Sequence, residues 1–97
     1  MKFNEKCYEK LKQVPKGKVT TYKHLAEALG SKAYRAVGNV MNKNPYAPKV
    51  PCHRVLKSTG EIGGFAHGPK KKITMLKSEG IEIKDGKVDL NKFLYKF

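Results

Sequence analysis

Residues 20–40, TTYKHLAEALGSKAYRAVGNV, contain two short amphipathic segments separated by a single glycine. Thr20 or Thr21 can cap a helix in the first segment. Its apolar positions recur at helical spacing: Tyr22, Leu25, Ala26 and Leu29. Gly30 is suited to end this helix, and Ser31 can cap the next one, which we expect over residues 32–44. Two short helices joined by a tight glycine turn are typical of a helix-turn-helix motif.

Two further helices are predicted on either side of this motif. Apolar residues at helical spacing indicate one over residues 3–13, with Phe3, Cys7 and Leu11 on its inner face. In the stretch 68–80, Pro69 is suited to the first turn of a helix and Gly80 to its end. We expect Ile73 and Leu76 on its inner face.

Turn residues predict two short β-hairpins. One spans residues 54–65 with its turn at 58–60, and the other spans 81–90 around the Asp85-Gly86 pair. The tail, 91–97, is expected to lay Phe93, Leu94 and Phe97 on the core. A chain of 97 residues is enough for one small domain. We therefore expect a mainly α fold with short β-hairpins, a helix-turn-helix (winged-helix-like) domain over residues 1–97.

The helix expected over residues 32–44 has an unusual outward face. Its core-facing residues are expected to be Ala33, Ala36, Val37 and Val40. The outward residues would then be Tyr34, Arg35, Gly38, Asn39 and Asn42. This face offers hydrogen-bond donors, one long cation and close backbone approach, which a helix that reads DNA needs. Close packing of Gly38 against another helix is the alternative interpretation.

The charge is strongly positive. There are 21 Lys and Arg residues against 8 Asp and Glu, a formal net charge of +13. Such an excess favours a polyanionic partner, nucleic acid first, with a general bias toward lysine for solubility as the alternative. We expect Lys70, Lys71 and Lys72 to contact phosphates. No apolar run approaches the roughly 18 residues of a membrane-spanning helix, so no membrane partner is expected.

The N-terminal residues lack the apolar stretch of a signal peptide. The two cysteines, Cys7 and Cys52, have dissimilar surroundings and need not pair. Free thiols in a reducing, cytoplasmic setting are therefore expected.

A candidate reactive centre lies in the stretch KVPCHRVLKSTGEIGGF, residues 49–65. A free cysteine has a pKa of about 8.5, and a neighbouring histidine or cation lowers it and makes the sulfur nucleophilic. In a plain strand Cys52 and His53 would point to opposite faces, whereas Pro51 favours a sharper geometry in which both share one side. A buried structural cysteine is the alternative for Cys52. No spacing of cysteine and histidine matches a finger-type zinc site, so no metal is expected.

These residues point to a family. PCHRV (51–55) and GGFAHG (63–68) resemble the active-site region of methylated-DNA–protein-cysteine methyltransferases, the O6-alkylguanine-DNA alkyltransferases. The resemblance extends to VPKGKVTTY (14–22), YRAVGNVMNKNP (34–45) and LKSEGI (76–81), and so covers nearly the whole chain.

The resemblance implies roles for individual residues. Cys52 matches the cysteine that accepts the alkyl group, and His53 matches the histidine that deprotonates it through water. Glu79 matches the glutamate that holds the histidine, and Asn44 matches the asparagine that braces the active-site turn. A thiolate beside an imidazolium would follow from such a relay.

The resemblance also implies a DNA-binding surface. Tyr22 matches a tyrosine that crowds the phosphate beside the extruded nucleotide, and Arg35 matches the arginine that fills the gap left in the base stack. The recognition helix of the family lies in the minor groove, which suits the small residues Ala36 and Gly38. Asn39 lies on the same predicted face.

A substrate pocket follows from the same comparison, with Val50, Pro51, Gly64, Phe65 and Ala66 as its residues. The carbonyl of Val50 would accept from the guanine amino group. Phe65 and Ala66 depart from the tyrosine and serine usual in the family. Backbone N–H groups of residues 63–66, or His67, would then have to donate to the base.

The reaction implied is single-turnover transfer of an alkyl group from O6 of guanine, or less well from O4 of thymine, to Cys52 after base flipping. It needs no cofactor, and its partner is double-stranded DNA. We expect a monomer, with cooperative binding along DNA left open. The resemblance starts at the first helix of the family's DNA-binding domain, so we expect the additional N-terminal domain usual in the family to be absent. The chain would then be a minimal member, an expressed fragment, or be completed by a separate chain.

Three other functions are considered. The first is a non-catalytic alkyltransferase-like protein that binds alkylated DNA and flags it for another repair pathway. Such relatives are short, but they typically carry another residue, often tryptophan, at the position of Cys52. The others are a helix-turn-helix transcription regulator, which would leave PCHRV without a purpose, and a cysteine hydrolase.

Overall fold

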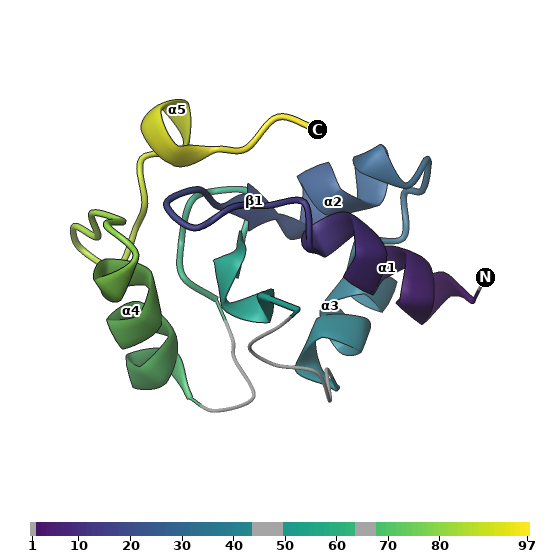
Figure 1. Ribbon diagram of the computed structural model, residues 1–97, viewed down its shortest axis with the longest axis horizontal. Coiled ribbons are helices and arrows are strands. Elements are labelled where there is room, and N and C mark those ends of the chain that lie inside the picture. Colours follow the sequence, from purple (N-terminus) through teal and green to yellow (C-terminus); the bar gives the residue numbers. More distant parts are fainter. Residues whose placement is uncertain (1, 44–49, 64–67) are drawn as a thin grey trace.

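The computed structural model describes residues 2–43, 50–63 and 68–97, except for the side chain of Asn42. Along the chain the elements are α1 (Phe3–Leu11), β1 (Thr20–Thr21), α2 (Tyr22–Ala28), α3 (Tyr34–Asn42), the 3-10 turn η1 (Cys52–Arg54), β2 (Val55–Leu56), α4 (Pro69–Ser78) and α5 (Leu90–Phe93). Figure 1 shows α1, α2 and α3 gathered at one end and α4 at the other, with the strands between them. The mainly helical class expected from the sequence is confirmed.

The predicted helix-turn-helix is present as α2 and α3, which pack on each other and on α1. The hydroxyl of Thr21 accepts a hydrogen bond from the backbone of His24 at 3.0 Å and caps α2. Gly30 follows the end of α2 with φ 71°, a left-handed conformation that glycine adopts at low cost. The hydroxyl of Ser31 accepts a hydrogen bond from the N–H of Ala33, and α3 begins at the next residue, Tyr34.

The inner face of α3 differs from the prediction. Val37 and Met41 are buried, one turn apart, whereas Ala33 precedes the helix and is exposed. Ala36 and Val40 are only half-buried. Because α3 begins only at Tyr34, its buried face lies toward the C-terminal half of the helix. Val37 and Met41 occupy this face, and their larger side chains bury more apolar area than alanine would. On α1 the end residue Phe3 is likewise 37% exposed rather than buried.

The strand pairing predicted for the hairpin over residues 54–65 is wrong. Residues 57–61 do form the expected turn, closed by a bond of 3.0 Å from the N–H of Lys57 to the carbonyl of Glu61. However, β2 pairs in parallel with β1, Thr20 opposite Val55 and Thr21 opposite Leu56. Parallel strands need a long crossover, which here contains α2 and α3. The second hairpin is confirmed as a two-residue turn at Asp85 and Gly86, both at positive φ, with two bonds between Lys84 and Lys87.

The small sheet separates two hydrophobic clusters. Val55 faces the cluster made by α1, α2 and α3, and its neighbour Leu56 faces the cluster that includes Leu76 of α4 and Phe93 of α5. Successive strand residues point to opposite faces, so β2 contributes to both cores. Phe97 is 42% exposed, so only part of the predicted tail packing is present.

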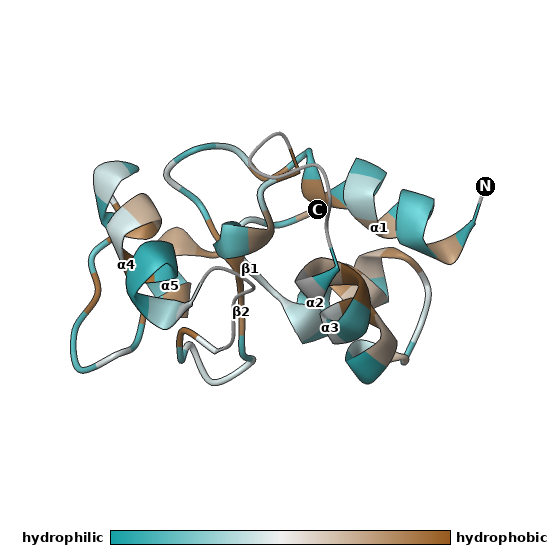
Figure 2. Cartoon of the chain, turned by 90° about the horizontal axis from the view of Figure 1, so that it is seen from below, coloured by the Kyte–Doolittle hydropathy of each residue, from teal (hydrophilic) through white to brown (hydrophobic). Residues whose placement is uncertain are grey.

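Figure 2 shows hydrophobic and hydrophilic positions mixed within each helix, as amphipathic helices with one buried face require. Within the described residues, no helix is both long and apolar enough to cross a bilayer.

Candidate active site

Cys52 sits on a sharp turn created by the preceding proline. Pro51 has φ −82° and ψ 68°, and the N–H of Cys52 donates to the carbonyl of Val50 at 2.8 Å, which is the geometry of an inverse γ-turn. The chain then enters η1, where the N–H of Arg54 donates to the carbonyl of Pro51 at 2.9 Å. Cys52 is 5% exposed and His53 2% exposed. The expected sharp geometry is confirmed, and an extended strand at this point is excluded.

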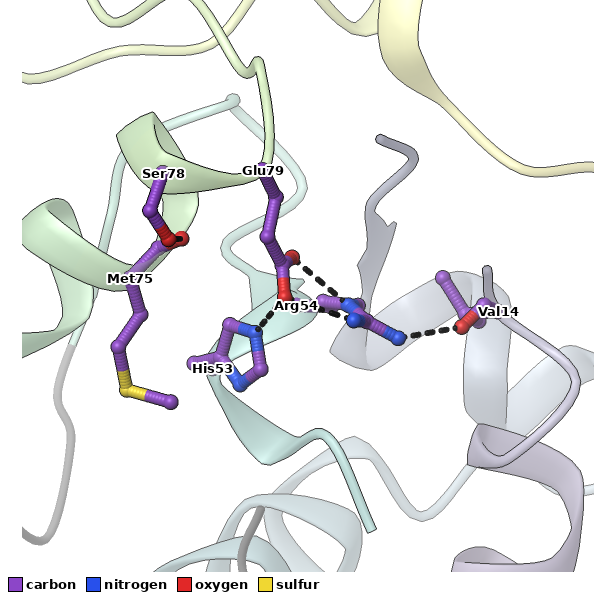
Figure 3. A network of polar contacts seen from close by, with 6 residues as sticks. All are labelled: Val14, His53, Arg54, Met75, Ser78 and Glu79. Atoms are coloured by element: carbon purple, nitrogen blue, oxygen red, sulfur yellow. Dashed lines mark hydrogen bonds and ion pairs between the residues drawn. The ribbon is translucent and has the colours of Figure 1, made fainter. Parts of the chain in front are cut away.

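Glu79, which ends α4, holds both residues that follow Cys52 (Figure 3). One carboxylate oxygen lies 2.9 Å from Nε2 of His53, and the same oxygen accepts from Nη2 of Arg54 at 2.7 Å. The other oxygen accepts from Nε of Arg54 at 2.9 Å. Arg54 also donates from Nη1 to the backbone carbonyl of Val14 at 2.9 Å. The guanidinium therefore ties η1 to both α4 and the segment after α1.

The ionisation of this network favours a neutral imidazole. Burial would raise the pKa of Glu79, but hydrogen bonds from Arg54 and His53 together hold it below its ordinary value. Burial lowers the pKa of His53 below its usual range, against the opposing effect of Glu79. A neutral His53 that donates from Nε2 to Glu79 presents Nδ1 as an acceptor, and Nδ1 has no hydrogen-bond partner among the described residues.

Lys72 is fully buried beside this turn. Its Nζ donates to the carbonyl of Val55 at 2.7 Å, immediately after η1. Burial lowers the pKa of Lys72 to about 8, and a negative charge on Cys52 raises it. The predicted phosphate contact by this lysine is therefore wrong, because an ammonium inside the core reaches no phosphate. Lys70 and Lys71 are exposed, as that prediction required.

Tyr22, the first residue of α2, packs against the core cluster that contains Cys52 and also lines a surface groove. Burial raises the pKa of Tyr22, and a negative charge on Cys52 raises it further, so the phenol stays protonated at neutral pH. The groove has a volume of about 440 Å³, and its walls include Tyr22, Lys23, Tyr34 and Lys57. The carboxylate of Glu61 also lines the groove, so two aromatic rings and an excess of one positive charge face a ligand there.

The outward face of α3 is open, as predicted. Arg35 and Asn39 are exposed, and within the described chain the guanidinium of Arg35 makes no hydrogen bond or ion pair. Ala36 and Gly38 are half-buried. A Cβ added at Gly38 would meet nothing within 4 Å, which excludes close helix packing as the reason for glycine in the isolated chain.

A family model described as the DNA-binding domain of 6-O-methylguanine DNA methyltransferase matches residues 2–81. The chain belongs to this family. A bifunctional methyltransferase/endonuclease of Picrophilus torridus is 43% identical over 89 residues, which cover 91% of this chain and 30% of that protein. The chain spans between 30% and 52% of the lengths of the first curated relatives that it matches.

Solved structures also resemble the chain, among them the following two. S. pombe Atl1, in complex with damaged DNA containing O6-carboxymethylguanine, superposes with a TM-score of 0.88 at 31% identity and covers 98% of this chain and 95% of its own. The O6-methylguanine-DNA methyltransferase of Pyrococcus kodakaraensis superposes with a TM-score of 0.77 at 45% identity, over 84% of this chain and 47% of its own.

Several residues that the family resemblance singled out lie outside the described residues: Asn44, Gly64, Phe65, Ala66 and His67. Val50 and Pro51, predicted for the substrate pocket, are buried. Because the carbonyl of Val50 already accepts from Cys52, a guanine amino group would have to share it. The roles of all these residues stay predictions. The other cysteine, Cys7, is fully buried in the first core cluster, which agrees with its predicted packing role.

Local sequence patterns do not identify two residues of the site. Arg54 follows His53 in the chain, but no local pattern predicts its bidentate pairing with Glu79. Lys72 is buried, although the sequence predicts it at the surface with Lys70 and Lys71. A signal did exist, because Lys72 lies four residues before the buried Leu76 and therefore on the same face of α4.

The stability of this family member is expected to fall in two steps as the pH decreases. Above about pH 6.5 the neutral His53 contributes fully to the free energy of unfolding. This contribution is lost as the pH falls through the lowered folded-state pKa of His53. The contribution of Glu79 is present above about 4.3 and is lost as the pH falls through its own lowered pKa. Urea unfolding between pH 8 and 3 measures both steps. A profile that is flat from pH 7 to 5, and unchanged in His53→Gln, would contradict this assignment.

Proposed function

We propose that this chain transfers a methyl or small alkyl group from O6 of guanine in double-stranded DNA, and less well from O4 of thymine, to Cys52. The observation that carries the proposal is the turn that places Cys52 beside a histidine held by a carboxylate. A soft thiolate is suited to a soft alkyl carbon. The product is a thioether that water does not cleave, so each molecule acts once.

The site supplies the proton transfers that this reaction needs. The Cys52 thiol gives its proton, through a water molecule, to Nδ1 of His53, and Glu79 stabilises the resulting imidazolium. The sulfur then forms a bond to the alkyl carbon while the bond from that carbon to O6 breaks. The electron pair leaves with the guanine, which takes up a proton from water, and His53 gives its added proton back to solvent. The protonated phenol of Tyr22 can donate a hydrogen bond to the adjacent phosphate.

DNA binding is proposed for the face that carries α3 and the groove beside Tyr22. The net charge of +13 favours a polyanion, and the exposed side chains of Arg35 and Asn39 can enter a groove of the duplex. O6 of guanine is inaccessible within the stack, so the nucleotide must be flipped at a cost of a few kcal/mol. A cation inserted in the vacated space offsets part of that cost.

Replacing Arg35 by alanine is expected to slow repair of a methylated duplex by about tenfold or more, because the flipped state loses the side chain that fills its vacancy. Repair of the same lesion in single-stranded DNA should change little. The matched control is Lys32→Ala, which removes one exposed positive charge next to α3. Equal duplex repair rates for Arg35→Ala and wild type would rule out the inserted-cation role.

Lesion binding without transfer is the second candidate function. It is favoured by the match to S. pombe Atl1, which extends over nearly the whole length of both chains. In that case the protein would hold alkylated DNA and leave the alkyl group on the base, and Cys52 would serve in packing.

One experiment separates the two functions. Protein is mixed with an equimolar duplex containing O6-methylguanine, and both components are analysed by mass spectrometry. Transfer predicts that the Cys52 peptide gains one methylene mass and that the duplex loses the lesion in a 1:1 ratio. An unchanged peptide and an intact lesion, under conditions where the duplex is fully bound, would establish binding alone.

A further inference from the structure

The C-terminal segment, residues 82–97, lies beyond the part of the chain that the family model matches, which ends at residue 81. It contains a two-residue hairpin turn, α5 and the tail after α5. Figure 1 shows it running from the end of α4 past β1 to the C-terminus. Val88 and Phe93 bury it in the hydrophobic cluster that also contains Leu76 of α4. The function proposed above assigns no role to this segment.

The hairpin of the C-terminal segment is bonded to the turn 57–61, which lines the surface groove of the candidate site. The N–H of Val88 donates to the carbonyl of Gly60 at 2.9 Å. The N–H of Ile62 donates in the opposite direction, to the carbonyl of Gly86 at 3.2 Å. An antiparallel bridge joins the two stretches of chain between these bonds. The hairpin therefore fixes one wall of the groove.

The backbones of the turn and the hairpin approach each other most closely at Gly60. Its φ is 90°, and a Cβ added there would lie 2.6 Å from the carbonyl oxygen of Val88. That separation is shorter than van der Waals contact, so any other residue would push the two backbones apart. Glycine is needed at this position both for the turn and for the contact with the hairpin.

The other end of the C-terminal segment is bonded to the residue before β1. The N–H of Val19 donates to the carbonyl of Phe93 at 2.9 Å, and the N–H of Tyr95 donates to the carbonyl of Val19 at 2.7 Å. Val19 and Leu94 thereby form a parallel bridge. Because β1 leads directly into Tyr22, these bonds fix the chain that carries the opposite wall of the groove.

The two walls meet beside Gly63. A Cβ added there would lie 3.4 Å from Cγ of Lys57 and 4.0 Å from Cε2 of Tyr22. Lys57 is exposed and is one of the two lysines that line the groove. The spacing between this lysine and the phenol therefore depends on two stretches of chain that the C-terminal segment joins.

We propose that residues 82–97 are a positioning element of the DNA-binding face. Bonded to Gly60 at one end and to Val19 at the other, they hold Lys57 next to Tyr22, where both can contact one stretch of DNA backbone. The role rests on the DNA binding proposed above. A segment that only completed the core would contribute to stability and leave the DNA contacts unchanged.

The test measures the affinity for an O6-methylguanine duplex against salt concentration in wild type, Lys57→Ala, Gly60→Ala and the double variant. Each phosphate contact contributes about 0.9 to the slope of log K against log salt concentration. Lys57→Ala should lower the slope by about that amount and weaken binding about tenfold at 0.1 M salt. Gly60→Ala keeps the lysine but separates the turn from the hairpin, so it should have the same effect. Removing Lys57 from Gly60→Ala should then change the affinity little further.

The matched control is Gly17→Ala. Gly17 has nearly the same φ, 91°, but a Cβ there would make only an ordinary contact, 3.7 Å from the carbonyl oxygen of Glu79. The control carries the same backbone strain away from the groove and should keep the wild-type slope. A wild-type slope in folded Gly60→Ala or in Lys57→Ala, or full additivity of the two substitutions, would overturn the proposal.

Hydrogen exchange of the wild-type protein gives the answer if Gly60→Ala fails to fold. Because coupling between two sites is mutual, duplex binding should slow exchange of the Val88 amide, which is bonded to Gly60. The amide of Lys87, bonded within the hairpin to the carbonyl of Lys84, should change much less. Equal protection of both amides, or of neither, would count against the positioning role. If the binding results hold but no methyl group leaves the DNA, the positioning role stands and the alkyl transfer proposed above fails.

Discussion

Cys52→Ala is expected to bind O6-methylguanine duplexes and to transfer no alkyl group at all. The substitution removes the proposed acceptor atom, and alanine fits the space of a residue that is 5% exposed. The fold and the outward face of α3 should therefore be retained. Gel-shift binding and mass spectrometry of the same sample measure the two properties together, and the lesion should remain on the DNA indefinitely.

The other cysteine provides the matched control for this variant. Cys7 is also a free, buried thiol, but it lies in the core cluster of α1. Cys7→Ala should keep one transfer per molecule, with only a modest loss of stability. Transfer by Cys52→Ala, or loss of transfer in a folded Cys7→Ala, would refute the assignment of the acceptor.

Arg54→Met is expected to cause the largest loss of stability of any single charge removal in the described chain, about 3 kcal/mol. The side chains of Arg54 and Glu79 are only 15% and 11% exposed, so the variant would leave a largely buried carboxylate without its bidentate partner. The bond to the carbonyl of Val14 would be lost as well. Urea unfolding at pH 7 measures the change.

An exposed ion pair on α1 serves as the comparison. Lys12 and Glu9 are 48% and 59% exposed, and Lys12→Met should cost at most about 1 kcal/mol. Replacing Arg54 and Glu79 together by methionine and leucine should recover much of the stability, because no unpaired charge remains. Transfer by this double variant should still be roughly 100-fold slower, since nothing then orients His53. If Arg54→Met and Lys12→Met lowered the free energy of unfolding equally, the buried ion pair would contribute no more to stability than the exposed one.

Local signals in the sequence predicted the parts of the fold that depend on neighbouring residues. A threonine cap was expected at Thr20 or Thr21, and the structure has it at Thr21. The left-handed glycine at Gly30, the first turn of α4 at Pro69 and the two-residue turn at Asp85 are confirmed. Each depends on backbone preferences within a few residues, which the sequence contains in full.

Partners distant in the sequence were predicted less well. Val55 and Leu56 have the composition of a hairpin strand, but they pair in parallel with residues that lie more than thirty positions earlier. No local pattern distinguishes these two outcomes, because strand pairing is decided by which faces can be buried. The same holds for the exposed Phe97, whose apolar character predicted burial.

The candidate site likewise has features that depend on neighbouring residues and features that depend on distant ones. The order of residues alone identified a cysteine made turn-prone by the preceding proline, a neighbouring histidine and an outward cationic helix face, because these features depend on types and short spacings. Folding alone brought Glu79 to His53 and Arg54 from more than twenty positions away, and buried Lys72 against the carbonyl of Val55 while Lys70 and Lys71 stayed exposed. The ionisation of a thiol or an imidazole depends on burial and on charges a few ångströms away in space, and those distances exist only once the helices have packed.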